Sequence, residues 1–265
     1  MMEKVYVCIP SYNSYEKFER CILSALRQVG CNFEIIVSDD STIKDVARRI
    51  EAFCKKSGVS YFHNNNSVGA ASNWNSLLDH AGGSLIKFLH HDDFFVSEHS
   101  LAILANSIEK SENCSILFCS SKLVVDGEAV SSTRVSKPLC NMINKSPSLL
   151  FSSNSLGGPS ACIFRYNKNL RFRDDFQWLV DLEFYYRALQ FGIVDCVEEE
   201  LVAVDVSSAG RLTSVVQSNF KINMKEHWEF LKAFRFRDWH FRLVYRFLRL
   251  VLRFGKSYAR ANKKL

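Results

Sequence analysis

The sequence predicts an α/β fold, with a mainly parallel central sheet and helices on both of its faces. The first observation is that short apolar runs alternate with amphipathic stretches over residues 5–91, in the order β-α-β-α-β-α-β. The second is that the polar clusters CIPSYN, VSDDS and HHDD lie at the ends of three of these apolar runs. Ligands of parallel sheets collect beyond the C-terminal ends of the strands, so we expect the three clusters to meet at one site.

The first half of the chain supplies four expected strands and three expected helices. The stretch 14–28 has helical spacing, which places Phe18, Cys21 and Ile22 on one face. Gly58 is expected to end the second helix. The strands are expected at 5–10, 33–40, 59–64 and 84–91, and the helices at 14–28, 42–58 and 69–82.

The second half has a weaker pattern. We expect loop and short helix from 126 to 157, where Ser, Asn and Lys are frequent and no clear period appears. Elsewhere the sequence predicts helices at 97–111 and 178–192, and strands at 114–125, 159–166 and 192–206.

Composition indicates a globular protein in a reducing compartment. Apolar residues make up 47% of the 265, enough for a sizeable core without disulfides. The nine cysteines form no C-x-x-C pair, which favours reduced thiols over a disulfide framework or a zinc site. The N-terminal apolar run is too short for a signal peptide, and no run reaches the ~20 apolar residues of a membrane span. We therefore expect a cytoplasmic protein.

The positive charge is concentrated in the C-terminal segment. Residues 232–265 hold eleven Lys and Arg against one acid, Asp238, so they carry +10 while the rest of the chain carries −4. Six basic residues fall on one helix face, and apolar and aromatic residues fill most of the remainder. This pattern is typical of a helix that lies on an anionic membrane surface. Self-association or packing of the apolar surface within the protein is the alternative, and nucleic-acid binding is disfavoured because the helix is too apolar. The six basic residues are Arg242, Arg246, Arg249, Arg253, Lys256 and Arg260.

Adjacent carboxylates at the end of the fourth strand are the strongest chemical signal. Asp92 and Asp93 must be hydrated, paired or metal-bound, because like charges side by side repel. Mg²⁺ or Mn²⁺ takes such oxygen ligands together with phosphates. A solvated turn is the plain alternative. Zinc is disfavoured, because no further ligand is spaced to join His90 and His91.

Two further acidic positions could serve a ligand. Asp39 and Asp40 follow the second strand, where an acid can accept from a ribose hydroxyl or a base N–H, or cap the next helix. Asp181 and Glu183 open a later helix and point about 200° apart, so only one can face a site. An acid there could act as a general base or only stabilise the helix N-terminus. The sequence lacks both G-x-G-x-x-G after the first strand and a P-loop, which disfavours NAD and P-loop NTPase sites.

In this order, the motifs resemble those of family 2 inverting glycosyltransferases, which have the GT-A nucleotide-sugar fold. The resemblance spans residues 4 to about 215. The matching segments are Pro10 to Asn13, Asp39 to Ser41, Asn66 with Gly69, Ala71 and Asn73, the acidic run HHDD, Gly157 to Arg165, and Val180-Asp181 with Arg187.

The resemblance implies a role for each matched site residue. It implies that Asp181 is the base that deprotonates an acceptor hydroxyl, and that Asp92 with Asp93 holds Mn²⁺ or Mg²⁺ on the donor diphosphate. The residues implied in nucleotide binding are Pro10, Tyr12, Asp39, Asp40, Gly69, Asn73 and Asp92. The chain departs from the family pattern where His90 replaces the first acid of the metal motif and where Val180 precedes the base. It also lacks a late His, for which Arg211 is a candidate substitute at the diphosphate.

The expected function is inverting, metal-dependent transfer of one sugar from a nucleotide sugar, such as a UDP- or dTDP-sugar, to a hydroxyl of a lipid-linked saccharide. Such reactions build bacterial surface polysaccharides such as O-antigen or capsule. We expect a catalytic domain at 1–220 and a membrane-associating segment at 221–265, peripheral on the inner face of the cytoplasmic membrane. The alternatives are a sugar nucleotidyltransferase and a non-catalytic, nucleotide-binding membrane scaffold.

Overall fold

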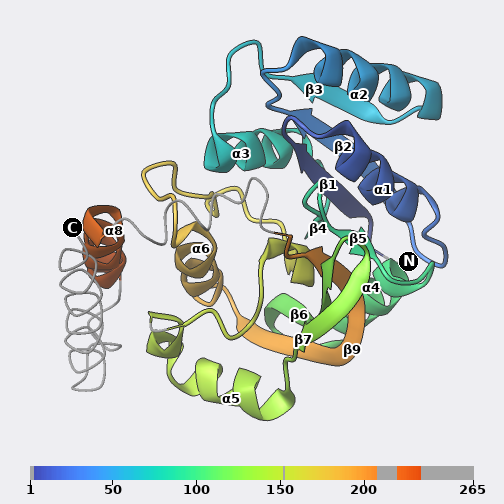
Figure 1. The fold of residues 1–265 in the computed structure, drawn as a ribbon. Helices are drawn as coiled ribbons and strands as arrows, with labels where there is room; N and C mark the ends of the chain where they lie inside the picture. The colour runs from blue at the N-terminus through green and yellow to red at the C-terminus, as the bar shows by residue number, and fades with distance from the viewer. Residues whose placement is uncertain (1–2, 152, 208–219, 234–265) are drawn as a thin grey trace.

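A nine-stranded sheet forms the centre of the protein (Figure 1), which we describe from a computed structural model covering residues 3–151, 153–207 and 220–233. The strand order is β3-β2-β1-β4-β8-β6-β9-β5, and β7 pairs with β6 outside this path. The strands are β1 (Val5–Ser11), β2 (Phe33–Asp39), β3 (Ser60–His63), β4 (Leu85–Phe88), β5 (Phe94–Phe95), β6 (Cys114–Val125), β7 (Glu128–Thr133), β8 (Cys162–Arg165) and β9 (Ile193–Asp205).

The first four strands form the parallel part of the sheet, and the remainder is mixed. β1 pairs in parallel with β2 and β4, and β2 with β3. β8 is antiparallel to both β4 and β6, whereas β6 and β9 run parallel. In the register of β1 with β2, Ser11 lies opposite Asp39, so both strands end at the same edge. This confirms the predicted α/β class and places the polar strand ends together.

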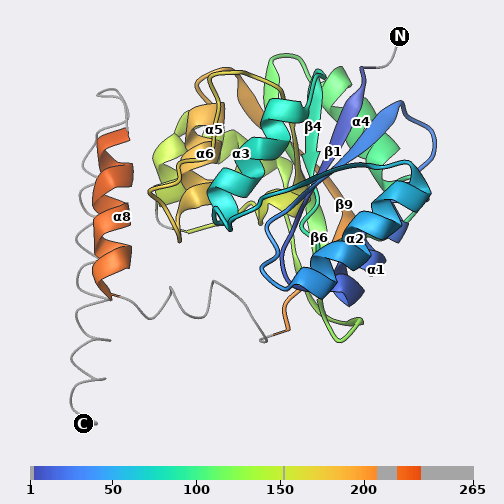
Figure 2. The same ribbon diagram turned by 90° about the horizontal axis from the view of Figure 1, so that it is seen from above.

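Helices cover both faces of the sheet. Figure 2 shows α1, α2 and α4 on one side, and α3 and α6 on the other. This arrangement is expected, because the strand order reverses direction at β1 and right-handed crossovers then put α3 opposite α1 and α2. The helices are α1 (Tyr15–Leu26), α2 (Lys44–Ser57), α3 (Ala70–His80), α4 (Ser100–Lys110), α5 (Lys137–Lys145), α6 (Val180–Ala188) and α8 (Phe220–Ala233), with short 3₁₀ helices η1 (Pro147–Phe151) and η2 (Pro159–Ala161).

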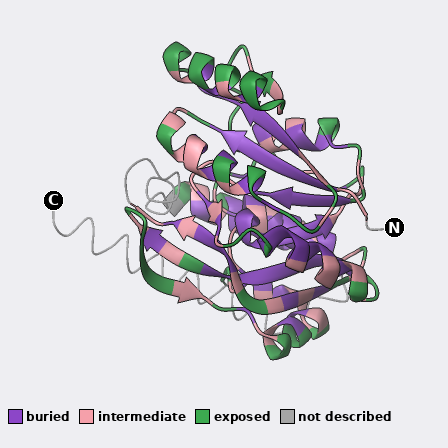
Figure 3. Cartoon of the chain, turned by 90° about the vertical axis from the view of Figure 1, so that its right-hand side faces the viewer, coloured by how far each residue is buried: buried purple, intermediate pink, exposed green. Residues whose placement is uncertain are grey.

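The core lies between the sheet and these helices. All seven residues of β1 are buried, as expected for a strand covered on both faces, and Figure 3 shows buried residues along the strands. Phe18, Cys21 and Ile22 of α1 are buried, which confirms the predicted helix face. Gly58 ends α2 in a left-handed conformation, as expected for a C-terminal glycine. The structure describes all nine cysteines as free thiols.

Three local expectations differ from the structure. β7 lies within the stretch expected to be loop and short helix, where the strand is polar and largely exposed. The two-residue strand β5 was not expected, and residues 159–161 of the expected strand form η2 instead. β5 pairs with the distant strand β9 and η2 packs against β4, β6 and β9, which a local pattern does not report. β7 instead forms a hairpin with β6 through the turn Asp126-Gly127.

The helix α8 packs beside η1 and α6 (Figure 1). Phe230 is fully buried, and its ring lies 5.8 Å from that of Phe151 and 6.0 Å from that of Tyr186. Arg211 and the basic stripe from 242 to 260 lie outside the described residues. No helix within the described ranges combines the length and apolar character that crossing a membrane requires.

Candidate active site

An acidic cluster stands at the C-terminal end of β4. Ligand atoms of His90, Asp92 and Asp93 all lie within 4.8 Å of one another. Asp93 is 4% exposed, whereas the other two side chains are half-buried. The turn after β4 is stabilised by a hydrogen bond from the Asp93 N–H to the His90 carbonyl, at 2.9 Å. The structure therefore brings together the residues that the sequence singled out for a metal.

The electrostatics of this cluster suit a bound cation. Burial and the neighbouring Asp92 carboxylate raise the pKa of Asp93 to about 8. Burial lowers the pKa of His90 to about 4, so its imidazole is neutral near pH 7 and can act as a ligand. The Nε2 atom of His90 is buried and has no hydrogen-bond partner among the described residues. Two adjacent carboxylates and an unpaired buried nitrogen together fit a divalent cation.

Arg20 and Asp205 hold the acidic cluster in place, and the sequence analysis missed both. The Arg20 guanidinium donates to the Asp92 carbonyl at 2.7 Å and to Asp205 Oδ2 at 2.8 Å. The Asp205 N–H in turn donates to Asp93 Oδ1 at 3.0 Å. Despite its burial, bonds from Ser207 and Arg20 hold the pKa of Asp205 well below its usual range. The one sequence signal for Asp205 was its position as an acid at the end of the expected strand 192–206.

Asp40 is fully engaged by the loop that leads into α3. Its Oδ1 accepts from the Asn64 side chain and the Val68 N–H, and its Oδ2 accepts from Ser67 and the Gly69 N–H, all between 2.7 and 3.0 Å. Four donors fill the acceptor sites of one carboxylate. Gly69 has a φ of +84°, which favours glycine there. The structure thus joins Asp40 and Gly69, and a base contact by Asp40 stays a prediction that would require exchange of a donor.

The other predicted nucleotide-binding residues surround the same strand ends. Asp39 is fully buried, and its carboxylate accepts from Ser41 and from the Tyr61 hydroxyl. Asn73 is 3% exposed and accepts from Ser38 Oγ at 2.6 Å. Pro10 is buried in β1, whereas Tyr12 is 49% exposed beyond its end. Tyr12 alone therefore has a ring free to meet a ligand.

Asp181 lies in the first turn of α6, and its half-buried carboxylate has few donors. Oδ2 accepts from Asn154 Nδ2 at 2.7 Å, and Oδ1 lies 2.8 Å from the Leu182 N–H. Burial outweighs these bonds and raises the pKa of Asp181 to about 6. Glu183, by contrast, is 1% exposed and pairs with Arg187 at 2.7 Å. Asp181 is therefore the acid of α6 that suits proton transfer near neutral pH.

One short segment connects Asp181 to the acidic cluster. Asn154 contacts Asp181, and six residues later Ser160 Oγ accepts from the His90 N–H at 2.9 Å. Six residues span at most about 20 Å. The buried Lys87 ammonium donates to the carbonyls of Ser160 and Phe88, which fixes the segment to β4. No hydrogen bond in the described part of the chain joins Asp181 to Asp92 or Asp93 directly, so their convergence stays a prediction.

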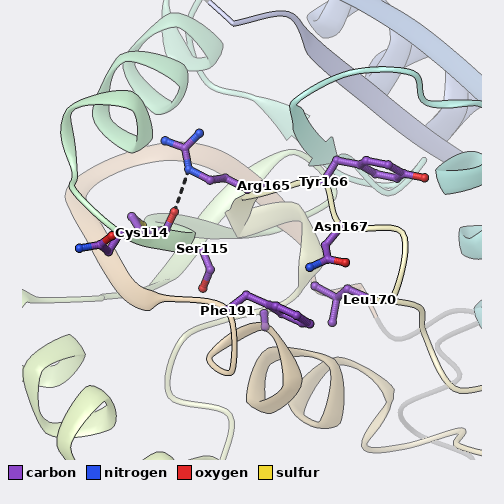
Figure 4. Close-up of a pocket in the computed structure, with 9 residues that line it drawn as sticks. Cys114, Ser115, Arg165, Tyr166, Asn167, Leu170 and Phe191 are labelled. Atoms are coloured by element: carbon purple, nitrogen blue, oxygen red, sulfur yellow. Dashed lines mark hydrogen bonds between the residues drawn. The ribbon is translucent and has the colours of Figure 1, made fainter.

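A cavity of about 390 Å³, whose lining is shown in Figure 4, lies away from these residues. It is lined by residues from the start of β6, the end of β8 and the end of α6, including Ser115, Arg165 and Phe191. Arg165 pairs with Leu85, the first residue of β4, whereas the acidic cluster follows the last. The Arg165 guanidinium is already bonded to the Cys114 carbonyl and to Glu3. We therefore take the strand ends, and not this cavity, as the active site.

Comparison with known sequences points to one family. A family model described as Glycosyl transferase family 2 matches residues 6–187. An uncharacterized protein of Mycobacterium tuberculosis is 30% identical over 230 residues, which are 80% of this chain and 70% of that protein. The Escherichia coli protein WfaP, a UDP-Glc:alpha-D-GlcNAc-diphosphoundecaprenol beta-1,3-glucosyltransferase, is 32% identical over 137 residues, about half the length of each protein (52% and 53%).

Solved structures share the fold at low sequence identity. The S. aureus protein TarS, residues 1–349, has a TM-score of 0.67 and 18% identity, covering 92% of this chain and 70% of the TarS chain. The mannosyltransferase PcManGT from Pyrobaculum calidifontis, solved with GDP-Man and Mn²⁺, has a TM-score of 0.63 and 12% identity. The match covers 86% of this chain and 65% of the PcManGT chain. These likenesses place the described sheet and helices among GT-A-like folds.

Proposed function

The chain belongs to glycosyl transferase family 2, and from that premise we propose that it catalyses metal-dependent, inverting transfer of one sugar from a nucleotide sugar to a hydroxyl of a lipid-linked saccharide. The observation that supports this most is that one short segment, residues 154–160, contacts both the acidic cluster and Asp181. An acidic cluster suited to a cation contacts Ser160, and a carboxylate with a raised pKa contacts Asn154.

Asp181 acts as the general base in this proposal. With a pKa of about 6, it is mostly ionised at pH 7 and still basic enough to accept a proton from an acceptor hydroxyl as that oxygen attacks. The oxygen forms a bond to the anomeric carbon from the face opposite the leaving group, which inverts that centre. The bond between the anomeric carbon and the diphosphate oxygen breaks, and the nucleoside diphosphate leaves with the electron pair.

His90, Asp92 and Asp93 would hold Mn²⁺ or Mg²⁺. Such an ion neutralises the charge that develops on a leaving diphosphate. Arg20 and Asp205 keep the Asp92 backbone and the Asp93 carboxylate in place. We propose that the nucleotide pocket lies beside this acidic cluster and is formed by Pro10, Tyr12, Asp39, Asp40, Gly69 and Asn73.

The proposed substrates follow from the relatives and from the charge pattern. WfaP uses UDP-Glc and a diphosphoundecaprenol-linked GlcNAc by its name, and TarS was solved with UDP-GlcNAc. We propose a UDP- or dTDP-sugar donor and a polyprenyl-diphosphate-linked acceptor in surface polysaccharide synthesis. The basic, apolar segment that ends the chain would bind the anionic cytoplasmic face of the membrane where that acceptor resides.

The test uses the full chain, MnCl₂, a panel of UDP-, dTDP- and GDP-sugars, and synthetic GlcNAc-diphosphoundecaprenol in detergent. Mass spectrometry of the lipid should show addition of one sugar residue with one donor, and EDTA should abolish that addition. Release of pyrophosphate from a nucleoside triphosphate and a sugar phosphate would support a nucleotidyltransferase instead. Absence of metal-dependent UDP binding would support a non-catalytic scaffold.

A further inference from the structure

The loop before α6 is held by a carboxylate from far along the chain. The N–H groups of Gln177, Trp178 and Leu179 donate to the side chain of Glu226 at 2.7, 2.8 and 2.9 Å. Glu226 lies on α8 and is 2% exposed. The start of α6 has no side-chain cap from its own N-cap residue, Leu179. Glu226 therefore binds the N–H of the N-cap residue and the N–H groups of the two residues before it, which fixes the chain as it enters α6.

This contact is electrostatically favourable and geometrically strict. N–H groups at a helix start lack intrahelical partners, and the helix dipole makes that end attract negative charge. Hydrogen bonds from N–H groups to a carboxylate are stronger than those between neutral groups. Three such bonds to one buried carboxylate fix the position of consecutive backbone units. Asp181 follows the last of these units by two residues, so its position depends on them.

The same helix also packs against the other side of the Asp181 environment. Phe230 and His227 of α8 both pack against Phe151, with ring centroids 5.8 and 5.4 Å apart. Phe151 ends η1, three residues before Asn154, which donates to Asp181 Oδ2. The two partners of the Asn154–Asp181 hydrogen bond are thus each flanked by a segment that contacts α8.

We propose that Glu226 is a positioning residue for the base, which ties the start of α6 to α8 and so holds Asp181 in line for proton transfer. This inference rests on the proposed function, in which Asp181 is that base. It also makes α8 a working part of the active site, although it lies beyond the residues that the family model matches.

Two substitutions and one control test the proposal. Glu226→Ala removes all three bonds, and Glu226→Gln keeps an acceptor oxygen but loses the charge. Glu229→Gln is the matched control, because Glu229 lies on the same helix and bonds only to Lys232 in the described chain. The measurements are hydrogen exchange of the backbone amides of residues 177–182, melting temperature, kcat, donor KM, and affinity for UDP with Mn²⁺.

We expect Glu226→Ala to speed exchange at 177–182 and to lower kcat by about 10- to 100-fold, since small misplacements of a catalytic group have effects of this size. Glu226→Gln should retain more of the rate, and the control should match wild type. Donor KM and UDP affinity should stay within about 2-fold, because the acidic cluster is not touched. A purely structural role would lower the melting temperature without changing the rate of the folded fraction.

Three results would overturn the inference. Unchanged exchange at 177–182 in Glu226→Ala would show that Glu226 does not hold the loop. Faster exchange with an unchanged kcat would show that the loop does not position the base. Full activity of Asp181→Asn would show that Asp181 is not the base. If wild type transfers no sugar from any donor, the proposed function fails with it, whereas transfer by wild type and by Glu226→Ala at equal rates overturns this inference alone.

Discussion

Replacing Asp181 with asparagine removes the proposed base while almost preserving the side-chain shape. The amide oxygen can still accept the hydrogen bond from Asn154 that the structure shows at 2.7 Å. With a pKa of about 6, the wild-type carboxylate is ionised in about 97% of molecules at pH 7.5. The substitution therefore removes a base that is ionised in nearly all wild-type molecules. General-base catalysis contributes about 10²- to 10⁴-fold, equivalent to about 3–5 kcal/mol of transition-state stabilisation.

The assay measures sugar transfer at saturating donor beside UDP affinity in the presence of Mn²⁺. We expect kcat to fall by about 10²- to 10⁴-fold with UDP affinity within about 2-fold of wild type. Asp175→Asn is the matched control, because this acid lies on the loop before α6 and pairs only with Arg173 in the described chain. Transfer by Asp181→Asn at more than a tenth of the wild-type rate would refute the assignment. Equal loss in the control would point to the loop and not to the base.

Three more predictions follow from the geometry. The transfer rate should fall as pH drops through about 6, because protonation of Asp181 removes the base. The hydrogen bond from Asn154 lowers the pKa of Asp181, so Asn154→Ala should raise that pKa and move the fall in rate to higher pH. A flat profile from pH 5 to 8 would contradict this. Asp93→Asn should weaken Mn²⁺-dependent UDP binding at least about 10-fold in calorimetry without lowering affinity for UDP alone, because even the loss of a residue that only supports a metal ligand has an effect of this size. Gly192→Ala should lower the melting temperature by several degrees, because the added Cβ would overlap a backbone carbonyl, whereas Gly158→Ala, whose Cβ meets open space, should not.

The position of the candidate site could be predicted because the order of strands and helices along the chain indicates the direction of each strand in the sheet. Strands that alternate with helices run parallel, so β1, β2 and β4 end at one edge and carry their polar residues there. The clusters VSDDS and HHDD could be placed on this basis alone. The strand β7 is polar and exposed, and the signal for it was the two-residue turn Asp126-Gly127, which joins it to β6 in a hairpin and was missed.

The residues that support the acidic cluster are brought together by long-range contacts, which a local sequence pattern does not report. Arg20 contacts Asp92 across 72 positions and Asp205 across 185. On its own helix, Arg20 is an ordinary polar residue of an amphipathic pattern. Charge and spacing along the chain carry no information about such partners, which only the closure of β9 onto β5 and β6 brings near.

The acids at the strand ends are chemically alike in sequence, and the structure separates them by how many donors each receives. Asp40 accepts from four protein donors, so the fold itself satisfies its carboxylate and uses it to close the loop before α3. The buried Asp93 and the half-buried Asp181 each receive fewer donors, and burial raises the pKa of each. Buried carboxylates with few donors and perturbed pKa values are concentrated at functional sites. This difference supports the proposal that Asp93 serves cation binding and Asp181 proton transfer, whereas the carboxylate of Asp40 is used within the fold.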